Sequence, residues 1–300
     1  MKILLLGKEG QVGWELHRAL STVGDLVAPE QQELDLEDLD DVRRWVRQHA
    51  PDIIVNAAAY TAVDRAESEP EKAYRINAEA VGLLAEEANR LNAWLVHYST
   101  DYIFDGEKTS PYEEDDPANP LSVYGRTKLE GEERIREQHA KHLIFRTSWV
   151  YTARGKNFVK TILRLAKEKE RLEIIADQHG APTSAELIAD VTALALHRVG
   201  HMESSTAVGG TYHLVAQGET SWHGYAQYVV KTAKDIGVSL KAGPDEVHPI
   251  PTEAYPLPAK RPRNSRLNVS KLTRIFRVHV PDWRDHVRRV IQELTDRGAL

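Results

Sequence analysis

Short, nearly continuous apolar runs alternate with longer segments of helical periodicity over the first half of the chain. The helical segments span 12–20 and 71–91, and another holds Tyr124 and Lys128. The apolar runs lie at 2–7, 52–59, 94–100 and 142–151. Strands that alternate with helices indicate parallel βαβ units, and strands without polar alternation indicate a sheet covered on both faces. We therefore predict an α/β fold with a doubly wound parallel sheet.

The alternation of strands and helices stops near the middle of the chain. We expect helices at 156–170 and 184–198 without strands between them, and a strand near 210–215 that returns to the first sheet. The segment 247–268 is rich in proline and polar residues, which is typical of a long ordered or ligand-covering loop. We predict a larger first domain and a smaller C-terminal α/β domain, at residues 1–150 and 151–300.

Composition narrows the class of protein. The 300 residues are 41% hydrophobic and 28% charged, as in soluble globular proteins, and no apolar run approaches the roughly 20 residues of a membrane helix. The net charge of −6 gives no basic footprint for nucleic acid. The chain has no cysteine, which excludes disulfides and thiol nucleophiles and agrees with a cytoplasmic location. We expect neither a membrane nor a nucleic-acid partner.

Gly7, Gly10 and Gly13 form a G-x-x-G-x-x-G motif between the first strand and the first helix. A dinucleotide site needs glycine there because the backbone turns tightly and the pyrophosphate approaches the helix N-terminus, where free amides and the helix dipole stabilise its charge. A glycine triplet alone also fits a plain turn, but its strand–loop–helix context favours an NAD(P)-binding, Rossmann-type first domain.

The cofactor's adenosine is expected beside the second strand, which should end near 27–30. Glu30 is the acidic candidate for the ribose hydroxyls and favours NADH, whereas Lys8 in the glycine loop suits the 2′-phosphate of NADPH. Both also fit solvated surface charges, so the choice stays open. Asp35 and Leu36 are candidates to flank the adenine, and Asp35 equally fits the cap of a helix starting near 37.

Small and hydroxyl side chains follow the next two strands. The stretch "NAAAYT" (56–61) places alanines where a dinucleotide would pass, and "HYSTDY" (97–102) offers Ser99, Thr100 and Asp101. Ligands of open α/β sheets bind outside the carboxyl ends of the strands. A hydroxyl there is placed to donate to a substrate carbonyl.

Tyr124 and Lys128 stand four residues apart and share one face of a helix. A nearby cation lowers the pKa of a phenol, which is ordinarily about 10, and brings it toward proton transfer at neutral pH. Reduction of a ketone needs a hydride on carbon, which a nicotinamide supplies, and a proton on oxygen. We predict Tyr124 as the proton donor, Lys128 as its cofactor-binding partner and Thr100 as the hydroxyl that polarises the substrate oxygen.

Several stretches resemble the extended short-chain dehydrogenases/reductases, and among them the dTDP-4-dehydrorhamnose reductase family. They are spread over nearly the whole chain: "ILLLGKEGQVGWEL", "DIIVNAAAYTAVDRAESEP", "VHYSTDYIFDG", "PLSVYGRTKLEGE", "LIFRTSWVY", "GAPTSAELIAD" and "RPRNSRLN". The resemblance implies reduction of the 4-keto group of dTDP-4-dehydro-β-L-rhamnose to dTDP-β-L-rhamnose, with NADPH or NADH, for polysaccharide synthesis. It also implies a substrate-binding role for residues 151–300 and a homodimer.

Carried over by position, the resemblance assigns roles to further residues. It implies that Asp101 and Trp149 contact the substrate. It implies a cofactor shell of Gly10, Gln11, Val12, Glu30, Asp35, Leu36, Ala59, Tyr60 and Thr61. It also implies an interfacial Mg²⁺ site of Glu15, Glu186 and Glu293, although Thr183 and Glu186 have capping-box spacing without a metal.

Arg261, Arg263 and Arg266 lie in the proline-rich loop of the second half. A nucleotide-sugar pyrophosphate needs fork-shaped cationic donors, and we expect at least one of the three, with Arg261 preferred, at the substrate.

Two other functions are compatible with the fold: a nucleotide-sugar epimerase or dehydratase that keeps its cofactor bound, and a non-catalytic regulatory subunit. The regulatory subunit would predict a broken Thr/Tyr/Lys set, whereas the set here is complete.

Overall fold

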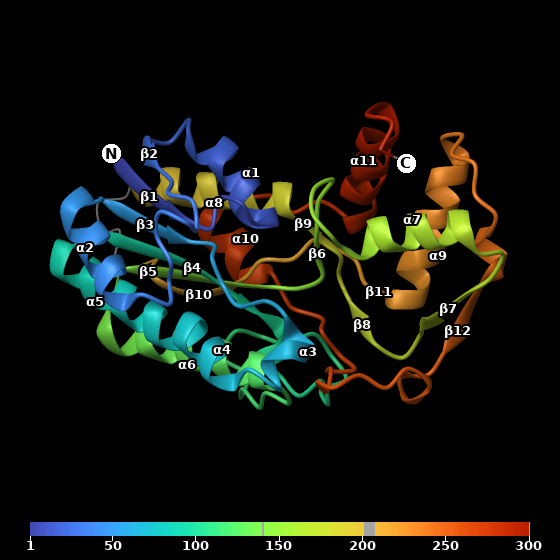
Figure 1. The fold of residues 1–300 in the computed structure, drawn as a ribbon, viewed down its shortest axis with the longest axis horizontal. Helices are drawn as coiled ribbons and strands as arrows, with labels where there is room; N and C mark the ends of the chain where they lie inside the picture. The colour runs from blue at the N-terminus through green and yellow to red at the C-terminus, as the bar shows by residue number, and fades with distance from the viewer. Residues whose placement is uncertain (140, 201–207, 300) are drawn as a thin grey trace.

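The computed structural model describes residues 1–139, 141–200 and 208–299. Figure 1 shows a lobe built around the central sheet and a second lobe of helices and short strands beside it. In this described part, the sheet has the order β10-β5-β4-β3-β1-β2, and every pairing is parallel. Its strands are β1 (Lys2–Leu6), β2 (Asp25–Val27), β3 (Ile53–Asn56), β4 (Trp94–Thr100), β5 (His142–Thr147) and β10 (Gly210–His213). The predicted doubly wound parallel sheet is confirmed.

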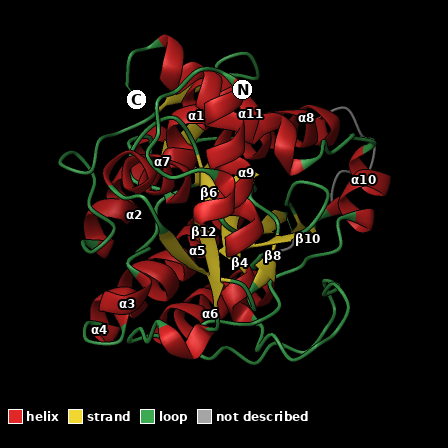
Figure 2. Ribbon diagram, turned by 90° about the vertical axis from the view of Figure 1, so that its right-hand side faces the viewer, coloured by secondary structure: helices red, strands yellow, loops and turns green. Residues whose placement is uncertain are grey.

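Both faces of this sheet are covered because its strands are apolar at successive positions. Ile3 and Leu5 of β1 pack into one hydrophobic core, and Leu4 and Leu6 pack into the other. Helices lie on both sides of the strands in Figures 1 and 2. The first face carries α1 (Gln11–Leu20) and α8 (Ala185–Gly200), and the opposite face carries α2 (Leu39–His49), α5 (Ala80–Leu91) and α6 (Val123–Gln138).

Helix α6 begins at an N-cap that fixes the position of its reactive side chains. The Oγ of Ser122 accepts a hydrogen bond from the amide of Gly125 at 3.1 Å, so Tyr124 lies in the first turn and Lys128 one turn later. The helix predicted at 71–91 is divided by a π-helical turn. Its parts are α4 (Pro70–Tyr74), η1 (Arg75–Glu79) and α5, preceded by α3 (Val63–Ala66).

The smaller lobe contains strands where none were expected. Between α7 (Phe158–Glu168) and α8, the chain forms β7 (Leu172–Ile175), β8 (His179–Gly180) and β9 (Thr183–Ser184), so the expectation of helices without strands between them is wrong. These strands escape a sequence pattern because they are two to four residues long and each pairs with a distant partner. The partners are β12 (Val247–Ile250) for β7, β11 (Thr220–Ser221) for β8 and β6 (Val150–Tyr151) for β9.

The chain crosses between the two lobes more than once. The helices α9 (Trp222–Asp235) and α11 (Trp283–Asp296) lie with α7 in the smaller lobe, whereas α8 packs on α1, and α10 (Ser270–Phe276) packs on β10. The strand expected at 210–215 is β10, which pairs with β5 in the central sheet. The division at residue 150 stays a prediction. Among the described residues, no helix is both long and apolar enough to cross a membrane.

Candidate active site

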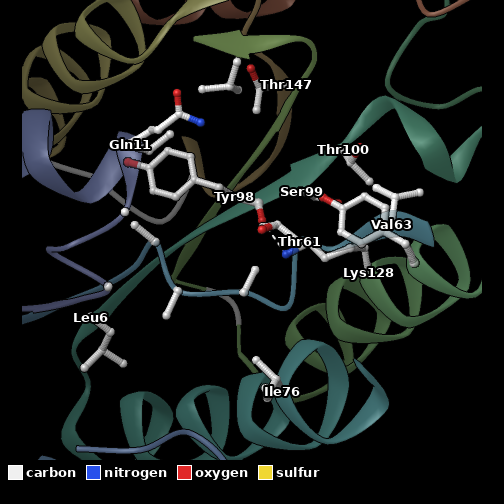
Figure 3. Close-up of a pocket in the computed structure, with 18 of the residues that line it drawn as sticks. Leu6, Gln11, Thr61, Val63, Ile76, Tyr98, Ser99, Thr100, Lys128 and Thr147 are labelled. Atoms are coloured by element: carbon white, nitrogen blue, oxygen red, sulfur yellow. Dashed lines mark hydrogen bonds between the residues drawn. The ribbon is translucent and has the colours of Figure 1, made fainter. Parts of the chain in front are cut away.

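A cleft of about 650 Å³ opens at the carboxyl ends of the central strands. The chain runs from β1 to β2 on one side of the sheet and then to β3 on the other side of β1, and such a switch point is where open α/β sheets bind ligands. The loops after β1, β3, β4 and β5 line the cleft, and Trp222 lines it from the smaller lobe. Figure 3 shows side chains from these loops arranged around it.

The glycine loop between β1 and α1 is built on close backbone contacts. Gly7 has a φ of 81°, and a Cβ on it would lie 2.7 Å from the amide nitrogen of Ala58. A Cβ on Gly13 would lie 1.8 Å from the carbonyl oxygen of Gly7. Gly7 and Gly10 line the cleft with Gln11 and Val12 of the first turn of α1, whereas Gly13 holds the helix against the loop. The arrangement presents free helix amides to an anion.

The residues predicted for the adenosine are divided between two hollows. Asp35 and Leu36 line the main cleft, but Glu30 lines an adjoining hollow of about 610 Å³ together with Lys8. The Glu30 carboxylate lies 3.5 Å from the Lys8 ammonium, so the two groups that favour different cofactors form an ion pair. Asp35 does not cap α2: it accepts from the amide of Glu37, and Asp38 is the N-cap.

The loop after β3 contributes two of its three predicted cofactor residues to the cleft. Ala59 and Thr61 line it, together with Ala58. The Tyr60 side chain is directed elsewhere, because its hydroxyl donates to Glu69 at 2.5 Å.

Thr100, Tyr124 and Lys128 are brought together at this edge of the sheet. All three line the cleft; Thr100 and Lys128 are buried and Tyr124 is partly buried, and the Thr100 hydroxyl is close enough to the Tyr124 phenol to lower its pKa. Thr100 ends β4, and its Oγ1 donates a hydrogen bond to Asp101 at 3.0 Å. Figure 3 shows Lys128 reaching from α6 toward the strand that carries Tyr98, Ser99 and Thr100. The end of β4 and helix α6 therefore bring these two hydroxyls together.

The electrostatics of the pair differ from the sequence-based expectation. Burial raises the pKa of Tyr124 to about 12, against the lowering effect of the Thr100 hydrogen bond. The expected lowering by the lysine is therefore wrong for this structure. Its physical reason is that the Lys128 ammonium nitrogen lies 2.6 Å from the carbonyl oxygen of Tyr98 and 3.1 Å from Nε2 of His97. Burial also lowers the pKa of Lys128 to about 8.

Asp101 and Trp149 both line the cleft, and their predicted contact with the substrate stays a prediction. Burial raises the pKa of Asp101 to about 6, although the nearby hydroxyls of Ser265 and Thr100 oppose this. Trp149 has a φ of 50°, unusual for a bulky residue, and its indole stacks on Trp222 with ring centroids 3.6 Å apart. The stacked pair presents a flat aromatic surface suited to a sugar or base ring.

The three arginines of the proline-rich loop are each held in ion pairs. Arg261 forms a bidentate pair with Asp64 of α3, at 2.7 and 2.9 Å, and does not line the cleft. Arg263 pairs with Glu253, and Arg266 pairs with Glu219. In this structure Arg261 therefore joins its loop to α3 next to the cleft.

The three glutamates predicted to bind Mg²⁺ do not form a cluster. In the described part of one chain, no group of three or more acidic or histidine side chains is placed to hold a metal. The carboxylates of Glu15, Glu186 and Glu293 instead pair with Arg18, Arg289 and Arg297. The capping interpretation of Glu186 is also wrong in detail, because Ser184 caps α8: its Oγ accepts from the amide of Leu187.

Some lining residues were not anticipated from the sequence. Tyr98, Tyr102 and Thr147 stand at or next to the ends of β4 and β5, so the strand-end rule would have found them. Trp222 gives no comparable signal, because a tryptophan at a helix start is usually a packing residue and its partner Trp149 is distant in the chain. The aromatic wall of the cleft thus depends on tertiary structure.

Comparisons with known proteins agree over the full length. The family model described as "RmlD substrate binding domain" matches residues 1–296. The chain is 51% identical over 304 residues to the dTDP-4-dehydrorhamnose reductase of Escherichia coli strain K12, with 100% of both chains covered.

Solved structures give the same result. A dTDP-4-dehydrorhamnose reductase from Clostridium acetobutylicum is 34% identical, with 98% of this chain and 100% of that chain covered and a TM-score of 0.88. A dTDP-4-dehydrorhamnose reductase from Bacillus anthracis, in complex with NADP, is 33% identical, with 97% and 99% covered and a TM-score of 0.88.

Proposed function

The chain belongs to the dTDP-4-dehydrorhamnose reductase family, and we propose that it reduces the 4-keto group of dTDP-4-dehydro-β-L-rhamnose to give dTDP-β-L-rhamnose, with NADPH or NADH. The observation that carries this is the Thr100–Tyr124 hydroxyl pair at the carboxyl edge of the sheet, inside a cleft that begins at a glycine loop. The shared name of the relatives supports the substrate. The NADP in the Bacillus anthracis structure supports the cofactor class.

The residues of the cleft fit a dinucleotide. The glycine loop leaves no room for a Cβ at Gly7 or Gly13, and the first turn of α1 offers its amides to a pyrophosphate. The buried hydroxyl of Thr147 lines the cleft and has no partner among the described residues, so it is available to a ligand. When bound, the nicotinamide supplies a hydride to the carbonyl carbon.

The remaining chemistry belongs to side chains of this chain. We assign Tyr124 as the donor of the proton to the 4-oxygen and Thr100 as the hydroxyl that polarises that oxygen. A raised phenol pKa keeps the Tyr124 proton in place until charge develops on the oxygen. Lys128 holds the cofactor ribose, Asp101 orients the sugar, and the Trp149–Trp222 pair excludes water from one side.

Three further properties stay predictions. They are a homodimer, a cytoplasmic location and an Mg²⁺ site shared between two copies of the chain through Glu15, Glu186 and Glu293. The choice between NADPH and NADH also stays open, because Lys8 neutralises Glu30. Paired kinetics with the two cofactors would measure the preference directly.

Cofactor stoichiometry tests the reaction. Purified protein with dTDP-4-dehydrorhamnose and NADPH should oxidise one NADPH for each dTDP-rhamnose formed, followed by absorbance and chromatography. An epimerase or dehydratase returns its hydride and would convert the sugar without net oxidation. A regulatory subunit would bind the cofactor and give no product. Either result would contradict the reductase assignment.

A further inference from the structure

His97 contacts the side chain of Lys128 and does not line the cleft. It sits in β4, is 1% exposed, and its two ring nitrogens face two different side chains. Nδ1 is 3.3 Å from Nδ2 of Asn56, the residue beside it on β3. Nε2 is 3.1 Å from Nζ of Lys128. The imidazole therefore bridges the end of β3 to the lysine of α6.

The direction of the first of these hydrogen bonds is fixed by Asn56. The backbone N–H of Ala58 donates to Oδ1 of Asn56 at 3.2 Å. A backbone N–H can only donate, so the atom of Asn56 that faces it must be the carbonyl oxygen. The other atom of the Asn56 amide, facing His97, is therefore the NH₂ donor, and Nδ1 of His97 must accept. Burial holds the pKa of His97 well below its ordinary value, so the ring is neutral. A neutral imidazole that accepts at Nδ1 carries its proton on Nε2.

An Nε2–H group next to Lys128 has a consequence for the lysine. An ammonium has three donors and no acceptor, so Nε2–H would meet another donor at 3.1 Å. A neutral amine has a lone pair and accepts that hydrogen bond, while still donating to the carbonyl oxygen of Tyr98. We propose that His97, held as its Nε2–H tautomer by Asn56, is a positioning residue that favours the neutral amine form of Lys128 and orients its nitrogen.

Other charged side chains near Lys128 also bear on its ionisation. Glu132, one turn later on α6, favours the ammonium form, but its carboxylate is bound to Arg146 of β5. Tyr124 of α6 and Asp101 of η2 (Asp101–Ile103) line the same cleft. The helices packed on α6 carry charged side chains in ion pairs that do not include Lys128: Asp64–Arg261, Lys72–Glu37, Arg75–Glu79 and Arg47–Glu87. The imidazole is the titratable side chain that contacts the lysine nitrogen directly.

The tautomer of His97 is directly measurable. In protein labelled with ¹⁵N-histidine, long-range ¹H–¹⁵N spectra distinguish protonated from unprotonated ring nitrogens, and a His97→Gln spectrum assigns the signals. We expect Nε2–H at pH 9, and a change toward Nδ1–H as Lys128 becomes an ammonium on lowering the pH to 6. In Lys128→Met, which has no donor, Nε2–H should persist over the whole range. Nδ1–H in the wild type at pH 9, or a Lys128→Met protein that changes as the wild type does, would overturn the proposal.

Asn56→Asp tests the same coupling from the other side. A carboxylate only accepts, so it places the proton on Nδ1 and leaves Nε2 free to accept from an ammonium. We expect the Lys128 ionisation, followed through the pH dependence of NADPH binding by fluorescence, to move upward by at least one pH unit.

The double variant Asn56→Asp/His97→Gln is the matched control. It keeps the added charge and removes the imidazole, so its ionisation should move much less. Equal shifts in the single and double variants would mean that charge alone acts, and would contradict the proposal. The inference rests on the proposed function only for the cofactor-binding role of Lys128, because the spectra observe His97 without substrate. A protein inactive as a reductase would leave the tautomer result standing.

Discussion

Replacing Glu132 with glutamine removes the carboxylate that fastens helix α6 to strand β5. The Glu132 side chain is fully buried, and Arg146 is 5% exposed; their closest contact is 2.7 Å. Without the carboxylate, the Arg146 guanidinium stays buried with an uncompensated charge, and breaking such a pair costs about 3–5 kcal/mol. We expect the free energy of unfolding, from urea denaturation followed by circular dichroism at pH 7.5, to fall by that amount in Glu132→Gln.

The matched control is Glu130→Gln, on the same helix. Glu130 pairs with Arg134 where the two side chains are 38% and 31% exposed, so its removal should cost no more than about 0.5 kcal/mol. The double variant Glu132→Met/Arg146→Met removes both charges and should recover most of the loss. A loss below about 1 kcal/mol in Glu132→Gln would refute the assignment of this pair as the anchor of α6.

The pH dependence of this stabilisation has a definite sign. Burial raises the pKa of Glu132, but the charge and hydrogen bonds of Arg146 outweigh it and leave the pKa below its ordinary value. A carboxylate with a depressed pKa stabilises the fold above its unfolded pKa, which is about 4.3, and this stabilisation is lost as the pH falls through the folded pKa. The difference between wild type and Glu132→Gln should therefore be full at neutral pH and shrink below about pH 4.

Three further substitutions test the cleft. Gly13→Ala forces its Cβ against the carbonyl oxygen of Gly7, 1.8 Å away, so it should destabilise the protein by at least about 1–3 kcal/mol and weaken NADPH binding in a fluorescence titration. Trp222→Ala removes the stacking on Trp149, worth about 0.5–1.5 kcal/mol, and should raise KM for the sugar about two- to tenfold. Trp222→Phe keeps an aromatic ring and should retain most of the stacking. An unchanged KM in Trp222→Ala would exclude the stacked pair from substrate binding. Burial raises the pKa of Asp101 to about 6, so wild type should lose stability relative to Asp101→Asn as the pH rises from 4 to 7. Thermal unfolding at each pH measures this. A stability difference between the two proteins that stays constant with pH would contradict the raised pKa.

Local sequence patterns predicted the features that depend on neighbouring residues. The apolar strands, the glycine loop and the order of Thr100, Tyr124 and Lys128 lie in continuous segments, and strand-end geometry then brings the three side chains together. The strand near 210–215 was also visible as a short apolar run, and its pairing with β5 follows the same parallel rule.

Features that depend on distant partners were not predictable in the same way. Arg261 has the composition of a phosphate ligand, but Asp64, 197 positions away, occupies its guanidinium. The pKa of Tyr124 was expected to fall because Lys128 is four residues away, yet the lysine nitrogen is held by the carbonyl oxygen of Tyr98, and burial dominates. Spacing along a helix gives proximity, whereas the direction of a side chain is set by the elements packed around it.

The proton-donor role of Tyr124 is tested most directly by Tyr124→Phe, which removes one hydroxyl and keeps the ring that packs on Tyr102. The measurement is single-turnover reduction of dTDP-4-dehydrorhamnose at saturating NADPH, with cofactor affinity measured on the same preparation. We predict an NADPH Kd within about twofold of wild type and a rate lowered by about 10²–10⁴, the usual contribution of a positioned proton donor. A Tyr124→Phe protein that reduces the sugar at a rate near that of wild type would contradict the account.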